Sequence, residues 1–363
     1  IRCIYLTFLN TKLKCSVARH HASGEMVKFS FRGRACYFLA VLGAINVVVF
    51  IARHGTQQQR SAEPLRQAPV QRTSRLAYVL LGSGRDEVQL ERILWQIRHN
   101  LLPWTPGDVL FFHTGEYDSA EQQQLVLKIL PQANISRIPR EAWTLPDGLR
   151  EEDAPRWKYA RCCPYPMHGI GYRHMCRWYS NGVFKYAAAH GYDWVLRLDE
   201  DSQVLTPVQQ DMAAWMEAHG KLYGMRLWDN DGPEVTWSLP ELTAWFITAH
   251  DVQPTFLYDD CRPRSVVGLH SRGGWRGSII FNNMFLANVS WWLSDPVQAY
   301  LGLVERSQGY YLYRWGDAPV HTMVVSMFLR RDQVHTFGFG YAHKEAHDAA
   351  RAYWGPALQD APP

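Results

Sequence analysis

The stretch Tyr192–Asp201, YDWVLRLDED, decides the fold that this chain is expected to adopt. Its mostly apolar part, 193–198, has the length of a buried strand and passes directly into three acidic residues. In open α/β sheets, ligands bind where the strands end. Two carboxylates spaced i, i+2 at such a place, here Asp199 and Asp201, can share one divalent cation that neutralises a diphosphate. A solvated acidic turn is the alternative for the triplet taken alone.

Segments of strand and helix character alternate on both sides of this stretch. Short apolar runs predict strands, and apolar residues at helical spacing predict helices. The predicted strands are 76–81, 108–113, 193–198 and 222–227, with a strand or loop at 278–288; the predicted helices are 86–102, 120–130, 173–190, 208–219, 240–250, 296–308 and 318–329. This alternation predicts one α/β domain, residues 75–357, with an open parallel sheet that helices cover on both faces.

The N-terminal part combines positive charge with an apolar segment. Residues 1–60 hold nine of the 38 Lys and Arg residues but one of the 34 acidic ones, so the rest of the chain is mildly acidic. That balance argues against a nucleic-acid-binding domain. Residues 35–52, ACYFLAVLGAINVVVFIA, are about long enough to span a bilayer as a signal anchor, with the basic residues 1–34 in the cytosol. A cleaved signal peptide is the alternative, although no small-residue cleavage site ends the segment.

Other segments outside the predicted domain lack a core-forming pattern. Residues 53–74 are rich in Gln, Arg and Pro and predict a flexible stem, and 358–363 predict a disordered tail. Because Met26 lies just before the basic residues that precede the anchor, residues 1–25 are hypothesised to be untranslated. The four Cys residues beyond the anchor permit disulfides in several pairings, with a zinc site as the weaker alternative; they are Cys162, Cys163, Cys176 and Cys261.

Three further motifs carry candidate chemistry. In Arg314–His321, RWGDAPVH, Asp317 is a candidate active-site carboxylate, and a helix N-cap is an equally good interpretation. In Gly338–His343, GFGYAH, the histidine is a candidate metal ligand or a hydrogen-bonded surface residue. In Gly171–Arg177, GYRHMCR, an Arg/His cluster at the start of a helix suits phosphate binding, and a solvated basic face is the alternative.

Taken together, these motifs resemble one known family, the fungal Golgi α-1,2-mannosyltransferases of glycosyltransferase family 15. The matching stretches are Tyr172–Arg177, Tyr192–Asp201, Gly309–His321 and Val334–His343. The resemblance covers roughly residues 159–343. It implies a GT-A fold behind a type II Golgi membrane anchor, with the catalytic domain lumenal. It also implies mannose transfer from GDP-mannose to a glycan or glycoprotein acceptor, with Mn²⁺ as cofactor and retention at the anomeric carbon.

The resemblance also implies roles for individual residues. Asp199, Asp201 and His343 match the positions of metal ligands, and Asp201 also faces the donor. Tyr172 matches a donor-contacting tyrosine, with Arg173 beside it in the donor pocket. Asp317 matches an active-site carboxylate. Trp315 and Asn283 are expected to contact the acceptor or a sugar.

Two departures from the family pattern leave the mechanism open. Phe281–Phe285, FNNMF, stands where the family has an aromatic-Ser-Asn-Phe-Glu string, so Phe285 replaces the proposed nucleophilic Glu. A phenyl ring cannot attack an anomeric carbon. Front-face return without a protein nucleophile, a charge supplied by Asp317, and an inactive relative are the alternatives. Ser83 and Gly84 replace an Arg-Asn pair after the first strand, which leaves the donor preference open.

Other classes of function compete with this one. A non-catalytic protein that binds sugar or nucleotide through the same fold is the chief alternative. A metal-dependent secretory hydrolase and a transferase for another nucleotide sugar are the others.

Overall fold

The computed structural model describes residues 73–156, 169–259 and 274–343. The predicted cytosolic tail, the anchor at 35–52, nearly all of the stem and the tail at 358–363 lie outside these ranges, as do Cys162, Cys163 and Cys261. Cys176 is a buried free thiol. Among the described helices, none has both the length and the apolar character needed to cross a bilayer.

A mixed sheet forms the centre of the domain. Its seven strands within the described residues lie in the order β3-β2-β1-β4-β7-β6-β8. They are β1 (Leu76–Leu81), β2 (Asp108–His113), β3 (Asn134–Arg137), β4 (Trp194–Leu198), β6 (Tyr223–Asn230), β7 (Ser278–Asn288) and β8 (Val334–Thr336). All neighbours pair in parallel except β7, which runs antiparallel to β4 and β6. The prediction of a wholly parallel sheet is therefore wrong, whereas the open α/β sheet is confirmed.

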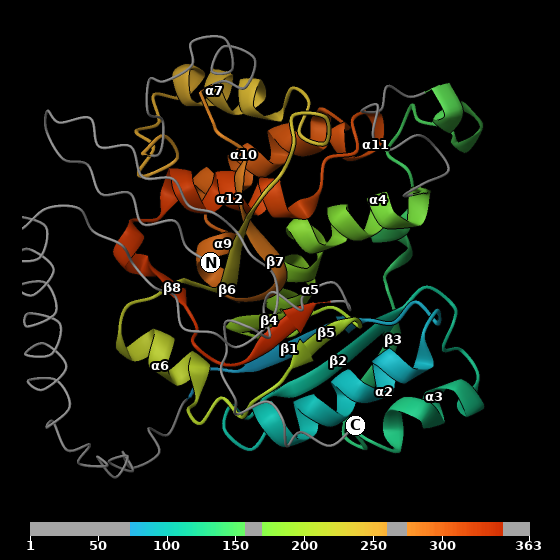
Figure 1. The fold of residues 1–363 in the computed structure, drawn as a ribbon. Coiled ribbons are helices and arrows are strands. Elements are labelled where there is room, and N and C mark those ends of the chain that lie inside the picture. The colour runs from blue at the N-terminus through green and yellow to red at the C-terminus, as the bar shows by residue number, and fades with distance from the viewer. Residues whose placement is uncertain (1–72, 157–168, 260–273, 344–363) are drawn as a thin grey trace, which may run out of the picture. The chain divides into compact units, whose positions relative to one another are not determined.

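Helices cover both faces of this sheet (Figure 1). On one face lie α2 (Glu87–Gln96), α3 (Ala120–Leu127) and α6 (Met212–Ala218). On the other face lie α4 (Ile170–Arg177), α5 (Val183–Ala189), α7 (Leu239–Ala249), α9 (Val289–Trp292), α10 (Asp295–Arg306), α11 (Gly309–Leu312) and α12 (Asp317–Phe328). The predicted helices are confirmed to within a few residues at most ends. The short strands β3 and β8 of this sheet were missed, as were the two short strands of the second sheet described below.

Local sequence explains where several helices begin. Asp86 accepts a hydrogen bond from the amide of Gln89 and so caps α2. Ser119 and Gln122 form a reciprocal capping box at the start of α3. Asp211 accepts from two amides at the start of α6. Each of these side chains satisfies backbone donors that a helix leaves unpaired at its first turn, which is worth about 1 kcal/mol per cap.

The core above β4 and β7 is largely aromatic. The rings of Phe184 and Trp292 stack with centroids 4.5 Å apart, and Phe285 stacks at 5.8 Å on Phe184 and at 5.8 Å on Tyr223. All four side chains are essentially inaccessible to solvent. Burial of such rings contributes most of the packing energy here, at roughly 25 cal/mol per Å² of apolar surface.

A small second sheet brings the end of the described chain back to the centre. β5 (Ser202–Val204) follows the acidic triplet directly, and it pairs antiparallel with β9 (Tyr341–His343). In this pairing Ser202 lies opposite His343. The hydroxyls of Ser202 and Tyr341 are hydrogen bonded at 2.8 Å, which fixes the same register.

Candidate active site

Two carboxylates and one imidazole converge beyond the end of β4, as the sequence predicted. Asp199 and Asp201 follow the strand, and His343 reaches them through the pairing of β9 with β5. The Nε2 atom of His343 lies 2.9 Å from Oδ1 of Asp201 and 4.0 Å from Oδ2 of Asp199. One ligand atom from each residue lies within 4.8 Å of the others. We call these three residues the metal-ligand cluster.

The chemistry of this cluster fits a divalent cation. Carboxylate oxygens with one imidazole nitrogen are a donor set that Mn²⁺ accepts. His343 is 7% exposed, and the side chains of Asp199 and Asp201 are 20% and 25% exposed, so the two carboxylates are partly accessible to solvent. A diphosphate that approaches from solvent could supply further oxygens to the ion.

The middle acid of the triplet points elsewhere. Glu200 accepts hydrogen bonds from the backbone amide of Ser83, at 2.8 Å, and from its hydroxyl. Arg85 lies at 3.5 Å from the same carboxylate but is largely exposed. Glu200 therefore holds the turn after β1, and the i, i+2 spacing alone directs Asp199 and Asp201 to the cluster.

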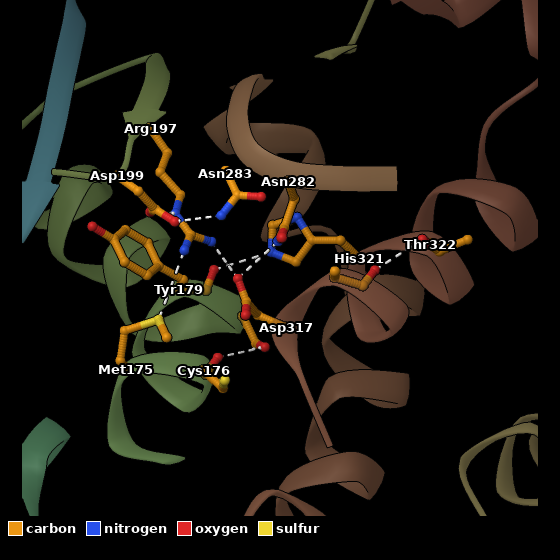
Figure 2. Close-up of polar contacts among 12 residues, drawn as sticks. Met175, Cys176, Tyr179, Arg197, Asp199, Asn282, Asn283, Asp317, His321 and Thr322 are labelled. Atoms are coloured by element: carbon orange, nitrogen blue, oxygen red, sulfur yellow. Dashed lines mark hydrogen bonds and ion pairs between the residues drawn. The ribbon is translucent and has the colours of Figure 1, made fainter. Parts of the chain in front are cut away.

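A second, fully buried charged group lies directly beside the cluster (Figure 2). The guanidinium of Arg197, the next-to-last residue of β4, donates from Nε to Asp199 at 2.8 Å and from Nη1 to Asp317. It also lies 3.6 Å from the ring centre of Tyr179. Asn282 donates to the same Asp317 oxygen at 2.8 Å. We call Arg197, Asp317 and Asn282 the arginine centre.

Asp317 is ionised in this setting. Burial raises the pKa of its carboxyl, but the charges of Arg197 and His321 and the hydrogen bonds from Arg197 and Asn282 outweigh that effect, so the pKa lies below its ordinary value. Asp317 is the first residue of α12, where the helix dipole also favours a negative charge. The alternative that Asp317 is the helix N-cap is wrong, because Gly316 occupies the cap position and Asp317 is the first helical residue. Its role as an active-site carboxylate stays a prediction.

A bulge in β7 brings the side-chain amides of Asn282 and Asn283 to the arginine centre and to the metal-ligand cluster, respectively. Between the pairs Met225–Phe285 and Leu227–Phe281, β7 holds two more residues than β6. Such a bulge changes where successive side chains point. Asn282 consequently reaches Asp317, and Asn283 donates from Nδ2 to Asp199 at 2.6 Å.

Two predicted site residues are instead structural. Trp315 is 1% exposed, and its indole nitrogen donates to the carbonyl of Trp237 at 2.6 Å. Arg173 is 0% exposed, and its Nη1 donates to the carbonyls of Tyr310 and Tyr311 at 3.1 and 3.0 Å. Neither side chain presents a surface to a ligand, so the predictions that Trp315 contacts a sugar and that Arg173 lines the donor pocket are wrong.

Tyr172 remains a candidate donor contact because it is partly exposed. Arg314 donates to its hydroxyl at 3.1 Å, and the guanidinium carbon lies 5.0 Å from the ring centre. Burial is the main cause that raises the pKa of the Tyr172 hydroxyl well above its usual value, so the phenol stays neutral. The pair provides one fixed cation and one neutral hydroxyl within electrostatic reach of Asp317.

Sequence reasoning missed Arg197 and Asn282. The available signal was an arginine in the middle of a strand that is otherwise apolar, because a buried charge requires a partner. Phe285, by contrast, lies in the aromatic core with its ring 4.9 Å from that of His321, so it offers no charge to the site.

The sheet, its connections and the residues gathered beyond β4 define a class of protein, the α/β glycosyltransferases with a GT-A-like fold. The family model described as glycolipid 2-alpha-mannosyltransferase matches residues 108–354. The chain therefore belongs to that family, as the resemblance predicted.

Individual relatives agree with this assignment. The chain is 25% identical over 268 residues to a glycolipid 2-alpha-mannosyltransferase of Saccharomyces cerevisiae, covering 73% of this chain and 60% of the relative. It is 28% identical over 273 residues to alpha-1,2 mannosyltransferase KTR1 of the same yeast, covering 74% and 68%.

Two solved structures share the fold. Core-mannan synthase A from Aspergillus fumigatus, in its Mn/GDP form, superposes with a TM-score of 0.67 at 20% identity and covers 76% of each chain. The mannosyltransferase Ktr4p from S. cerevisiae, in complex with GDP, gives 0.66 at 21% identity and covers 75% of this chain and 71% of its own.

Proposed function

We propose that this protein transfers mannose from GDP-mannose to a glycan or glycoprotein acceptor, with Mn²⁺ as cofactor and retention at the anomeric carbon, forming an α-1,2 linkage. The observation that carries the proposal is the convergence of Asp199, Asp201 and His343 at the carboxyl end of β4. Family membership supports mannose as the sugar. The relative described in its Mn/GDP form supports the metal and the nucleotide.

Different residues of this chain would have different roles in such a reaction. A bound Mn²⁺ would stabilise negative charge on the diphosphate leaving group. The metal-ligand cluster would hold that ion, and Tyr172 with Arg314 would orient the donor beside it. Arg197 fixes Asp199 in place, and it keeps Asp317 ionised. Asp317 would lie next to the reacting sugar. A fixed carboxylate favours the positive charge that develops at the anomeric carbon.

The buried position of Phe285 favours one route to retention. No carboxylate stands at that position, and Asp317 is already bonded to Arg197 and Asn282. We therefore assign front-face return, in which the departing diphosphate guides the acceptor hydroxyl, with Asp317 as an electrostatic stabiliser.

Donor hydrolysis by the purified protein tests the proposal. We expect GDP release from GDP-mannose with Mn²⁺ and none with a chelator. Hydrolysis of other GDP-linked sugars and of UDP-linked sugars should be slower. His343→Ala should reduce the rate at least about 100-fold, and Asp317→Asn should reduce it by a similar factor, at unchanged circular dichroism. An unchanged rate in His343→Ala contradicts the metal assignment.

A non-catalytic binding protein is the second candidate, and the absence of a carboxylate at Phe285 favours it. It predicts that GDP-mannose binds with Mn²⁺ but is not turned over, with or without an acceptor glycan. Binding calorimetry beside the hydrolysis assay separates the two functions.

The proposal includes a location. Residues 35–52 would anchor the protein in the Golgi membrane as a single-pass type II protein, with residues 53–74 as a stem and the transferase domain in the lumen. These residues lie outside the described ranges. Protease protection of the domain in sealed Golgi vesicles tests the orientation, and digestion without detergent contradicts it.

A further inference from the structure

The side chain of Asn283 lies against two members of the metal-ligand cluster. Its Nδ2 atom is 2.6 Å from Oδ2 of Asp199 and 3.0 Å from Nε2 of His343. The backbone reinforces this position, because the amide of Asp199 donates to the carbonyl of Asn283 at 3.2 Å. The carboxamide is therefore held against two of the three predicted metal ligands.

Two neighbours make different demands on Nε2 of His343. An amide nitrogen can only donate, so a hydrogen bond from Asn283 requires Nε2 to accept. The same Nε2 lies 2.9 Å from Oδ1 of Asp201, so a donor nitrogen and a carboxyl oxygen both face this one imidazole nitrogen. A cation between these atoms would satisfy the imidazole lone pair and both carboxylates at once.

Nδ2 of Asn283 cannot bind such a cation, but a rotation of the carboxamide would bring its oxygen to the same position. The nitrogen and oxygen of an asparagine amide occupy nearly equivalent positions, and the surrounding hydrogen bonds decide which faces a site. The hydrogen bond to Asp199 turns Nδ2 toward the cluster. With an ion, the carbonyl oxygen is the favoured atom, because Mn²⁺ accepts carbonyl oxygen as readily as carboxylate oxygen.

We propose that Asn283 is a fourth protein ligand of the cation, through Oδ1, together with Asp199, Asp201 and His343. This inference rests on the proposed function, because it requires that the cluster binds a metal. It also gives the bulge in β7 a role. The extra residues let Asn282 donate a hydrogen bond to Asp317 while Asn283 coordinates the ion.

Electron paramagnetic resonance of bound Mn²⁺ tests the proposal without any measurement of catalysis. The full chain is produced with asparagine that carries ¹³C in the side-chain carbonyl, and Mn²⁺ is titrated in. We expect a ¹³C hyperfine coupling to the bound ion, because the labelled carbon is bonded to the liganding oxygen. Asn283→Ala should lose this coupling and bind Mn²⁺ about 10- to 100-fold more weakly.

Asn282→Ala is the matched control, since it removes the neighbouring amide from the same bulge. It should keep the coupling and change the Mn²⁺ affinity by less than about threefold. Bound Mn²⁺ without a ¹³C coupling in the unaltered protein overturns the proposal, even if Asn283→Ala does not fold. If the unaltered protein binds no Mn²⁺ at all, the proposed function fails as well, so the two failures are distinguishable.

Discussion

The metal-ligand cluster and the arginine centre lie side by side but balance their charges differently. In the arginine centre, Arg197 and Asp317 are 2% and 8% exposed and oppose each other directly. In the cluster, two acids face one imidazole, and the nearest cation, Arg197, is shared with Asp317. The arginine centre is thus complete within the protein, whereas the cluster needs an added positive charge. The charges of the arginine centre therefore need no ligand, whereas the cluster is the candidate site for an added cation.

The largest effect should come from removing the shared cation. Arg197→Met leaves Asp317 buried without its partner, which costs roughly 3–5 kcal/mol in the free energy of unfolding. Urea unfolding followed by fluorescence measures it. A loss below about 1 kcal/mol would show that the arginine centre does not depend on this pair.

A divalent cation should stabilise the folded protein by binding to the metal-ligand cluster and not to the arginine centre. Mn²⁺ at a concentration of about 100 Kd should raise the free energy of unfolding by about 2.7 kcal/mol. The melting temperature with Mn²⁺ and with chelator measures the effect. His343→Ala should abolish it, and an equal shift in that variant would contradict the assignment of the cluster.

Acid should lower the free energy of unfolding by protonating His321, a buried histidine near the arginine centre. Nε2 of His321 lies 3.0 Å from the Tyr179 carbonyl, so it donates, and Nδ1 accepts from the Tyr223 hydroxyl at 2.9 Å. Burial lowers the pKa of His321 to about 4 from 6.5. The unfolded chain therefore binds more protons in this range, and stability that is complete above pH 6.5 is lost as the pH falls toward 4.

One such histidine changes the free energy of unfolding by at most about 1.4 kcal/mol per pH unit. His321→Gln should reduce the slope of stability against pH by up to that amount. Part of the slope should remain, because burial lowers the pKa of His174 to about 4 as well. Denaturant unfolding between pH 4 and 7 gives both slopes, and identical slopes would contradict the assignment.

The smallest effect should come from the exposed ion pair at the edge of the site. Arg85 is 82% exposed and lies 3.5 Å from Glu200, which keeps its hydrogen bonds to Ser83. Arg85→Met should change the free energy of unfolding by less than about 1 kcal/mol. It is also the control for Arg197→Met, and a comparable loss in both variants would mean that burial does not distinguish the two arginines.

The two acids of the cluster were candidates from local sequence, because the acidic triplet ends an apolar strand. A histidine at the end of a glycine-rich loop is by itself no evidence of a metal ligand, and His343 was assigned to the cluster through the resemblance to the family. Most strands and helices followed from periodicity. The antiparallel direction of β7 could not, because a strand that is buried on both faces has no pattern that reports its direction.

Burial was the main source of error. Trp315 and Arg173 belong to residue types that bind sugars and phosphates, and only the tertiary structure shows that both are enclosed. The bulge that separates the directions of Asn282 and Asn283 depends on the pairing of β7 with β6, which no local motif reports. Site residues that depend on strand register were thus out of reach from sequence alone.

The pairing of β9 with β5 has a consequence for biosynthesis. The imidazole comes from the last described strand, whereas both carboxylates come from the middle of the chain. A nascent chain still on the ribosome, or a product clipped before residue 341, would carry the acids without the histidine. If the cluster binds a metal, loading would therefore require that translation has passed this strand and that the strand has paired with β5.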